Sequence, residues 1–433
     1  MSPRPVPLRL LPDSARVEAD GSLSIGGCSL ADLADSYGTP LFVYDEGHLR
    51  ARCREAVRTF GADAVIYASK AFLCSAMAAL VHDEGLLIDV ATGGELHVAL
   101  HAGVPAERCV LHGNNKSLEE LRMALTAGAD SQSRPGVRHV VIDSFDEIDR
   151  LAALRAEGLP RPRVMVRVTP GIHAHTHDYI ATGQDDSKFG FNLGNGDAAR
   201  AVEGVRATSC GDLIGLHCHI GSNVFAVESF ARAAEAMSTF ARGFGLPELT
   251  MGGGLGVAYT EDEEAPTITA WGAAILDACA ASGLQARVSV EPGRSIVASA
   301  AVTLYRVGTI KAIEGIRTYV SVDGGISDNP RPVLYGSGYE AFKVADVGAE
   351  RTMPARLVGK HCESGDVLIF DADVPDSLAV GDLVATPVTG AYGHSMASNY
   401  NKVPRPAVVF VGDGRSRLVV RRETYDDLVR LDL

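Results

Sequence analysis

Lys70 is the residue of this chain best suited to covalent chemistry. The apolar runs AVIYAS and AFL lie on either side of it. A lysine at the end of a buried strand has a lowered pKa, and its amine is then a nucleophile towards carbonyl groups. Most lysines are solvated surface residues, but this apolar context favours a chemical role.

Two further stretches carry residues that suit anion binding and acid chemistry. The glycines Gly252, Gly253 and Gly254 follow an apolar run; they form either a plain turn or a backbone cradle for a phosphate. Arg294 adds a bidentate donor for phosphate or carboxylate. Glu291 ends the run ARVSVE, and a buried carboxylate there needs a partner. That partner is either Arg294 or the protonated ring nitrogen of pyridoxal phosphate.

The sequence HCH, residues 217–219, also permits a metal interpretation. Alternate residues of a strand point to one side, so His217 and His219 could share a metal ion. Barrel metallohydrolases usually carry this pair on their first strand, where this chain has Lys70. Three more histidines, at 173, 175 and 177, lie in a long polar loop, where solvated histidines are common. A metal-dependent hydrolase is therefore the weaker alternative, and we predict no metal ligand.

An exposed thiol marks the stretch KHCESGD, residues 360–366. Polar residues flank Cys362 on both sides, with the carboxylate of Glu363 next to it. Cysteines without a chemical task are usually buried. The stretch therefore predicts a functional loop.

Eight short apolar runs predict the strands that position these residues. Helix-like segments with apolar residues at three- and four-residue spacing lie between them, one of which opens with a capping box at Ser117 and Glu120. Such alternation predicts an α/β fold, a (β/α)8 TIM-type barrel with its active site at the carboxyl ends of the strands. The predicted strands lie within residues 64–70, 86–92, 109–113, 139–144, 162–170, 213–220, 248–254 and 286–293.

The pattern changes after about residue 295. Short β-branched runs then follow one another with turns and no clear helices, which predicts a C-terminal all-β domain. The first forty residues are also β-rich. We therefore predict an N-terminal β segment (1–40) that joins the C-terminal domain, a barrel (41–295) and a β domain (296–433).

Composition excludes several classes of protein. The 433 residues suit a barrel with a smaller second domain, and the net charge of −14 without a basic run argues against binding nucleic acid or an anionic membrane. Eight scattered cysteines without a CxxC pair fit a reducing compartment. The N-terminus lacks the apolar stretch of a signal peptide, and no run approaches the ~18 apolar residues of a membrane span. These features predict a cytoplasmic location.

Long motifs in a fixed order resemble one family, the barrel-type pyridoxal-phosphate decarboxylases, which act on diaminopimelate, ornithine or arginine. HTHDYI, SDNPRPVLYG and CESGD resemble the diaminopimelate branch rather than the ornithine branch. The resemblance covers nearly the whole chain. The motifs are YASKAF, DVATGGEL, HGNNKS, HTHDYIATG, DSKFGF, GLHCHIGSN, GGGLG, EPGRS, SDNPRPVLYG, GKHCESGD and GAYGHSMASNYN.

The resemblance implies a lyase that uses pyridoxal 5'-phosphate to convert meso-2,6-diaminopimelate to L-lysine and CO2, the last step of lysine biosynthesis. Lys70 is implied to bond the cofactor, His219 to stack on its ring, and Glu291 to hold its ring nitrogen. The residues implied to hold its phosphate are Ser222, Gly252, Gly253, Gly254, Pro292, Gly293, Arg294 and Tyr392.

For the substrate, the resemblance implies binding by Arg294, Arg331, Tyr335 and Tyr392, with Glu363 reading the distal ammonium group. Cys362 is implied to act in proton transfer, although either Cys362 or Lys70 could return the final proton. The family also implies a homodimer in which the Cys362 loop enters the partner's site. The sequence departs from many relatives at Gly338, where they carry a basic residue.

Three other functions stay open at this point. A decarboxylase of another basic amino acid, ornithine or arginine, would share most motifs. A pyridoxal-phosphate racemase would share the barrel but not need CESGD or a clamp for a diacid. A regulator without activity is expected to have lost Lys70 or Cys362, and both are present.

Overall fold

The computed structural model describes residues 4–128, 136–172 and 186–433. The chain divides into two compact units. A barrel unit comprises Arg52–Gly256 and Ala265–Ser295, and a β unit comprises Met1–Ala51, Val257–Glu264 and Ile296–Leu433. The domain limits 1–40, 41–295 and 296–433 stay a prediction.

The barrel unit contains the eight parallel strands that the apolar runs predict. They pair in the order β13-β12-β11-β9-β8-β7-β6-β5, and a parallel bridge between Val65 and Val290 joins the two ends. The predicted (β/α)8 barrel is therefore confirmed. The strands are β5 (Ile66–Ala68), β6 (Leu87–Val90), β7 (Cys109–Leu111), β8 (His139–Ile142), β9 (Arg163–Thr169), β11 (Asp212–Cys218), β12 (Glu248–Thr250) and β13 (Arg287–Ser289), with β10 (Phe191–Asn192) beside β9.

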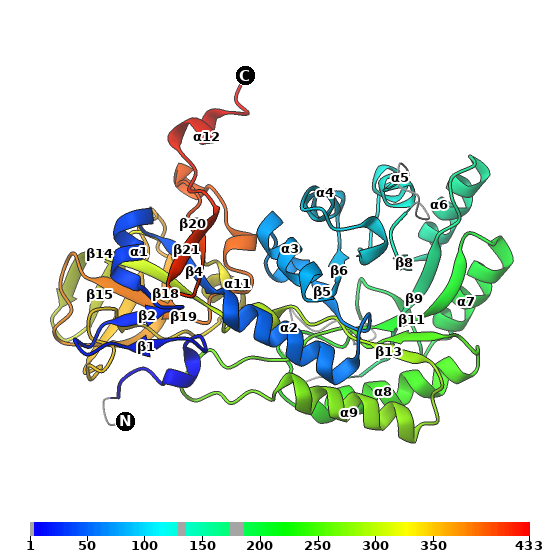
Figure 1. Ribbon diagram of the computed structural model, residues 1–433, viewed down its shortest axis with the longest axis horizontal. Helices are drawn as coiled ribbons and strands as arrows, with labels where there is room; N and C mark the ends of the chain where they lie inside the picture. The colour runs from blue at the N-terminus through cyan, green and yellow to red at the C-terminus, as the bar shows by residue number, and fades with distance from the viewer. Residues whose placement is uncertain (1–3, 129–135, 173–185) are drawn as a thin grey trace. The chain divides into compact units, whose positions relative to one another are not determined.

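The helices of this unit lie outside its strands (Figure 1). Their starts follow local sequence signals: Ser117 and Glu120 form the predicted capping box, in which each side chain bonds the other's backbone N–H. They are α3 (Ser75–Asp83), α4 (Gly93–His101), α5 (Leu118–Thr126), α6 (Phe145–Ala156), α7 (Asp197–Thr208), α8 (Val227–Arg242) and α9 (Ile268–Ala281); α2 (Glu46–Phe60) and α10 (Arg294–Val297) span the limits between the units.

The interior of the barrel is a packed core rather than a channel. One apolar cluster takes a buried side chain from each of five successive strands, and Ile214 of β11 packs against it. Because the strands are buried on both faces, their sequences are almost continuously apolar. The core fixes the strand ends that carry the chemistry. Its members are Ile66, Leu87, Val110, Val141 and Met165.

The β unit is rich in sheet, as predicted, but it also contains short helices. The helices α11 (Arg331–Tyr335) and α12 (Tyr425–Val429) have only five residues each, too few to show a helical period in the sequence. The expectation that this region has no helices is therefore wrong. A third helix, α1 (Leu30–Tyr37), lies in the N-terminal segment.

Two sheets make up the β unit. The N-terminal strand β4 (Leu41–Asp45) pairs with β14 (Ala301–Ile313) and with β20 (Ala407–Gly412), which joins the two ends of the chain in one sheet. The small sheet holds β1 (Arg16–Val17), β2 (Leu23–Ile25) and β3 (Cys28–Ser29). The large one also holds β15 (Arg317–Val322), β16 (Phe342–Lys343), β17 (Met353–Val358), β18 (Val367–Val374), β19 (Leu383–Pro387) and β21 (Arg415–Val420).

Within the described part of the chain, no helix has both the length and the apolar character needed to cross a membrane.

Candidate active site

Lys70 lies at the carboxyl end of β5, on the short 3-10 turn Ser69–Ala71. Its two neighbours are buried, but Lys70 itself is exposed. The expectation of a buried lysine is therefore wrong for this chain. Lys70 lies on the turn after β5, outside the buried strand, at the carboxyl end of the barrel.

Glu291 follows β13 at the same end of the barrel and is only 6% exposed. Its Oε2 lies 2.9 Å from His217 Nε2, and its Oε1 lies 2.9 Å from His112 Nε2. Burial alone would raise the pKa of this carboxyl group, but the two histidines bring the pKa well below 4.5. Glu291 is therefore an anion. Its partners are histidines, and not Arg294 as the sequence allowed.

The three glycines after β12 form a cradle that no side chain could enter. A Cβ on Gly252 would lie 2.6 Å from Cys218 O, one on Gly253 2.0 Å from Glu291 O, and one on Gly254 2.1 Å from Gly221 O. Gly252 and Gly254 also have φ values of 65° and 106°, which favour glycine. Bare backbone is thus required here, as in a close approach to a bound phosphate.

His219 and Arg294 lie around this cradle. The backbone N–H of Gly253 donates to His219 Nδ1 over 3.2 Å. Burial, followed by the charge of Lys70, lowers the pKa of His219 well below 6.5, so its ring is neutral and carries its proton on Nε2. Arg294 Nη2 donates to Ser222 Oγ over 2.8 Å. The turn before Arg294 is equally tight, since a Cβ on Gly293 would lie 2.9 Å from Ala68 O.

These groups fit pyridoxal phosphate. The barrel unit presents an amine, a carboxylate held as an anion, a neutral flat ring and a cradle of backbone, hydroxyl and guanidinium groups. They match the aldehyde, ring nitrogen, ring face and phosphate of that cofactor. They lie after strands β5, β11, β12 and β13, which are neighbours in the closed barrel.

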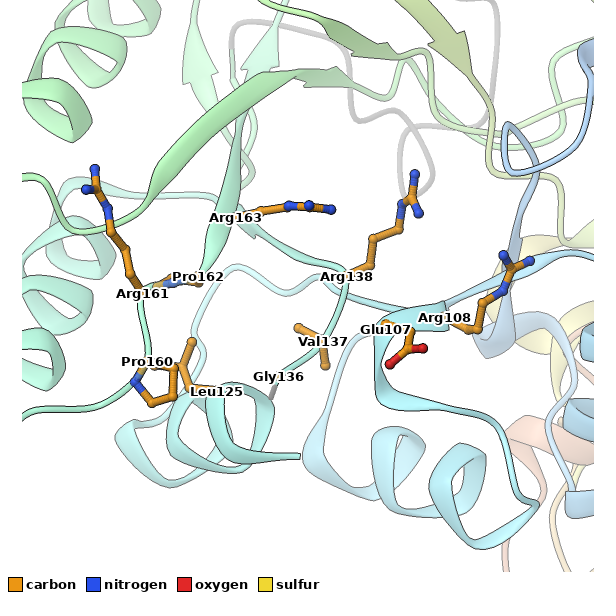
Figure 2. A pocket seen from close by; sticks show the side chains of 10 residues that line it. All are labelled: Glu107, Arg108, Leu125, Gly136, Val137, Arg138, Pro160, Arg161, Pro162 and Arg163. Carbon is orange, nitrogen blue, oxygen red and sulfur yellow. The ribbon is translucent and has the colours of Figure 1, made fainter. Parts of the chain in front are cut away.

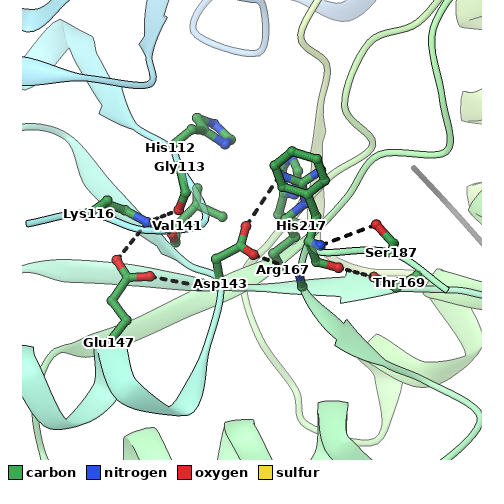
Figure 3. Close-up of polar contacts among 12 residues, drawn as sticks. His112, Gly113, Lys116, Val141, Asp143, Glu147, Arg167, Thr169, Ser187 and His217 are labelled. Carbon is green, nitrogen blue, oxygen red and sulfur yellow. Dashed lines mark hydrogen bonds and ion pairs between the residues drawn. The ribbon is translucent and has the colours of Figure 1, made fainter. Parts of the chain in front are cut away.

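A buried polar network braces the strand ends on the other side of the barrel (Figure 3). Lys116 is 2% exposed, pairs with Glu147 Oε1 at 2.6 Å and donates to the carbonyls of Gly113 and Val141. The Glu147 carboxylate in turn accepts the backbone N–H of Asp143. This pairing was missed from the sequence, although Lys116 lies in the motif HGNNKS.

Asp143 extends this network to the next strand. Its Oδ2 lies 3.4 Å from Arg167 Nη1, and its Oδ1 accepts the backbone N–H of Gly190 over 2.7 Å. The guanidinium of Arg167 also lies 4.4 Å from the centre of the Phe189 ring. The network therefore fixes the segments that follow β7, β8 and β9.

In the β unit, Arg331 is held in an aromatic cage. It is 3% exposed; its guanidinium lies 4.2 Å from the centre of the Tyr259 ring and 5.4 Å from that of Tyr339, and it donates to the Tyr339 hydroxyl. Tyr335, at the end of the same short helix, is half-buried, as is Tyr392. Tyr392 has a φ of 58°, which is uncommon for a bulky residue and marks a constrained turn.

Cys362 and Glu363 are exposed, as the sequence predicts. Their loop is fixed at its base: Asp366 accepts the backbone N–H groups of His361 and Ile326, each over 2.7 Å. The backbone N–H of Cys362 donates to Asn401 Oδ1 over 3.0 Å. The loop thus presents both side chains on a rigid base.

The histidines at 173, 175 and 177, with the motif HTHDYI, lie outside the described residues. His112, His217 and Glu291 have ligand atoms within 4.8 Å of one another, a separation that a metal ion could also bridge. In the structure these atoms contact each other directly. The sequence suggested that His217 and His219 could share a metal ion, but the structure gives them different partners. His217 bonds Glu291, and His219 accepts the backbone N–H of Gly253.

A separate cavity of about 400 Å³ lies at the opposite end of the barrel (Figure 2). Arg108, Arg138 and Arg163 stand at the starts of β7, β8 and β9 and line it. Arg108 is already paired with Asp63. The cavity shares none of the groups that fit the cofactor.

The barrel and its strand-end groups together define a barrel-type pyridoxal-phosphate enzyme. Residues 46–298 match the family model described as pyridoxal-dependent decarboxylase, pyridoxal binding domain. The chain is 48% identical to the diaminopimelate decarboxylase of Mycobacterium tuberculosis, over 95% of both chains, and 47% identical to that of Bacillus subtilis, over 97% of both. This chain therefore belongs to the diaminopimelate decarboxylase family, which confirms the resemblance seen in its motifs.

Solved structures of diaminopimelate decarboxylases are similar to this chain over almost its full length. The crystal structure of diaminopimelate decarboxylase from M. jannaschii in complex with L-lysine has a TM-score of 0.87 and 30% identity, covering 97% of this chain and 98% of that chain. The enzyme from Helicobacter pylori complexed with L-lysine has a TM-score of 0.81 and 30% identity, covering 93% of this chain and 98% of that one.

Proposed function

We propose that this chain uses pyridoxal 5'-phosphate to decarboxylate meso-2,6-diaminopimelate to L-lysine and CO2, the last step of lysine biosynthesis. One observation supports this most. Lys70, the Glu291 carboxylate and the glycine cradle gather at the carboxyl end of one barrel, in a chain nearly half identical to diaminopimelate decarboxylases over almost its full length.

The barrel residues bind and orient the cofactor. Lys70 would hold the cofactor through its amine, and His219 would lie against the cofactor ring. Ser222, the cradle of Gly252, Gly253 and Gly254, the turn of Pro292, Gly293 and Arg294, and Tyr392 hold the phosphate. When bound, the cofactor supplies an electron sink for the pair left by the departing CO2. Glu291 would favour a protonated ring nitrogen, because the two histidines lower the pKa of its carboxyl group well below 4.5.

The substrate residues distinguish the two ends of diaminopimelate. Arg331 binds the distal carboxylate, since its planar guanidinium offers two parallel donors and the Tyr259 and Tyr339 rings restrict its orientation. Glu363 binds the distal ammonium group, and Arg294, Tyr335 and Tyr392 complete the contacts. The opposite charges of Arg331 and Glu363 bind the carboxylate and ammonium groups of the distal L centre, so that decarboxylation occurs at the D centre.

A proton must return to the α-carbon after CO2 leaves. We propose Cys362 or Lys70 as the donor, because both side chains are exposed. We also propose a cytoplasmic homodimer in which the loop of Cys362 enters the partner's site. Mixing inactive Lys70→Ala and Cys362→Ala chains should then restore part of the activity, whereas no restoration would contradict the shared site.

A substrate panel tests the function. The purified holoenzyme should show the visible absorption of a lysine-bound cofactor and release CO2 from meso-diaminopimelate, and Lys70→Ala should abolish both. Equal or faster CO2 release from ornithine or arginine would favour another decarboxylase of the family. Epimerisation of diaminopimelate without CO2 release would favour a racemase.

A further inference from the structure

We propose that His112 and His217 are positioning residues that clamp the Glu291 carboxylate, one imidazole on each oxygen, so that Glu291 stays anionic and aimed at the ring nitrogen of the cofactor. This inference rests on the proposed function, because it assigns the carboxylate to that nitrogen. The proposal concerns residues that act through Glu291 and do not themselves touch the reacting atoms.

The two sides of the clamp differ: His217 Nε2 and Glu291 Oε2 form a hydrogen bond, whereas His112 Nε2 and Glu291 Oε1 meet as an ion pair without hydrogen-bond geometry. His112 follows β7, His217 lies on β11, and each Nε2 is 2.9 Å from a different oxygen of Glu291. The two imidazole rings meet edge to face, with centres 5.0 Å apart and planes at 66°. All three side chains are at most 8% exposed. The carboxylate therefore has little freedom to rotate about its last bond.

A buried carboxylate needs this support, because an isolated buried charge is very costly. Neither nearby arginine of the barrel provides it. Arg294 donates to Ser222, and Arg167 pairs with Asp143. The histidines thus replace the arginine that usually accompanies a buried acid.

The surroundings of the two histidines shift their pKa values in opposite directions. Burial lowers the pKa of His217, so it bonds Glu291 as a neutral imidazole with its proton on Nε2. Burial acts against charge at His112 as well, but Asp89 and then Glu291 raise the pKa of His112 above 6.5. His112 Nε2 lies 3.9 Å from Asp89 Oδ1. The surroundings of His112 therefore favour its charged form, while His217 donates to Glu291 as a neutral ring.

The groups that face Glu291 also favour a protonated ring. His112 Nε2 lies between Glu291 Oε1 at 2.9 Å and Asp89 Oδ1 at 3.9 Å, and Arg167 pairs with Asp143 instead of Glu291. An anionic carboxylate beside the ring nitrogen favours a pyridinium over a neutral pyridine.

The clamp predicts an asymmetry between glutamine substitutions. His217→Gln keeps a neutral N–H donor, so it should keep most of the cofactor affinity. His112→Gln removes the ring that pairs with Glu291 Oε1 and any charge it carries, and should change the protonation of the ring nitrogen and of Glu291. His217→Leu removes the hydrogen-bond donor and His112→Leu removes the ion-pair partner of Glu291, and each should weaken pyridoxal-phosphate binding about 10–100-fold, the range found when groups that orient metal ligands are lost.

The matched control is His139→Leu. His139 is also a buried histidine of the barrel, 2% exposed, and neither of its ring nitrogens has a hydrogen-bond partner among the described residues. It begins β8, whereas Glu291 follows the end of β13. The His139→Leu variant loses a buried imidazole but keeps both contacts to Glu291. Its affinity for pyridoxal phosphate should stay within twofold of the wild-type value.

The experiment measures cofactor affinity by equilibrium dialysis with pyridoxal phosphate, and ring-nitrogen protonation by solid-state ¹⁵N NMR of bound, ring-¹⁵N-labelled cofactor. We expect a pyridinium signal in the wild-type enzyme and in His217→Gln, and a shift towards neutral pyridine in His112→Gln. If a leucine variant does not fold, the two glutamine variants decide. Wild-type affinity and an unchanged ¹⁵N signal in both His112 variants and in His217→Leu would overturn the clamp.

Other outcomes separate this inference from the proposed function. A wild-type enzyme that binds pyridoxal phosphate and decarboxylates diaminopimelate, with variants that do not differ from it, would contradict the clamp alone. A wild-type enzyme that does not bind the cofactor would contradict both. One equivalent of zinc that survives dialysis and is lost in His217→Leu would show that the three residues are metal ligands, and would also overturn the clamp.

Discussion

Gly253→Ala should disturb the cofactor site through a single added methyl group. A Cβ on Gly253 would lie 2.0 Å from the carbonyl oxygen of Glu291 and 2.9 Å from its carbonyl carbon. A carbon needs at least ~3 Å from a backbone oxygen, so the segments after β12 and β13 must separate by about 1 Å. Such overpacking typically destabilises a protein by about 1–3 kcal/mol.

Gly253→Ala should reduce activity by more than its loss of stability alone would cause. Glu291 moves together with its own carbonyl group, and a displacement of ~1 Å at a reacting centre can cost about 100-fold in rate. We therefore expect kcat/KM for meso-diaminopimelate to fall by about two orders of magnitude in Gly253→Ala, with weaker binding of pyridoxal phosphate.

The matched control for this substitution is Gly194→Ala. Gly194 is an exposed glycine of the same unit, and a Cβ there meets nothing within 4 Å. Steady-state decarboxylation, cofactor titration and thermal unfolding should be measured for both variants. The reasoning is refuted if Gly253→Ala keeps its cofactor affinity and kcat/KM within twofold of Gly194→Ala.

Three further variants test other parts of the structure. Arg331→Lys should raise KM for meso-diaminopimelate at least tenfold (about 1.4 kcal/mol), because lysine lacks the two parallel donors of arginine. The control in steady-state kinetics is Arg415→Lys, at an exposed arginine of β21. Equal KM values for the two variants would contradict a substrate contact of Arg331. Lys116→Met should destabilise the barrel unit by about 3–5 kcal/mol by leaving Glu147 buried and unpaired, and Lys116→Met/Glu147→Leu should recover most of this in urea unfolding; equal loss in both variants would contradict the pairing. Burial raises the pKa of Asp328 from 3.8 to about 7, so the folded state keeps a proton that the unfolded state loses, and the free energy of unfolding should fall as the pH rises from 4 to 7. Asp328→Asn should flatten that fall, and an unchanged pH profile would show that Asp328 does not cause it.

The barrel could be predicted because its signals are local. Each predicted run contains one observed strand, apart from the first residue of β11, since strands buried on both faces must be apolar along their length. The capping box at Ser117 and Glu120 was predicted for the same reason: it needs only residues three apart. Strand ends were therefore known, and with them the end of the barrel at which Lys70, His219 and Glu291 gather.

The contacts within the site could not be predicted, because they join residues far apart in the sequence. His217 and Glu291 are 74 positions apart, and no local pattern distinguishes a histidine that bonds Glu291 from the metal ligand that HCH also suggests. The exposure of Lys70 was missed because apolar neighbours indicate a buried strand but not the turn that follows it. The helix α11 was missed because five residues show no period.

The most direct test of the proposed function is the stoichiometry and chirality of the reaction with meso-diaminopimelate. The purified holoenzyme should release one CO2 for each L-lysine formed, with no D-lysine, because the distal L centre is the end that Arg331 and Glu363 recognise. Formation of D-lysine, or consumption of diaminopimelate without CO2, would contradict the proposed function.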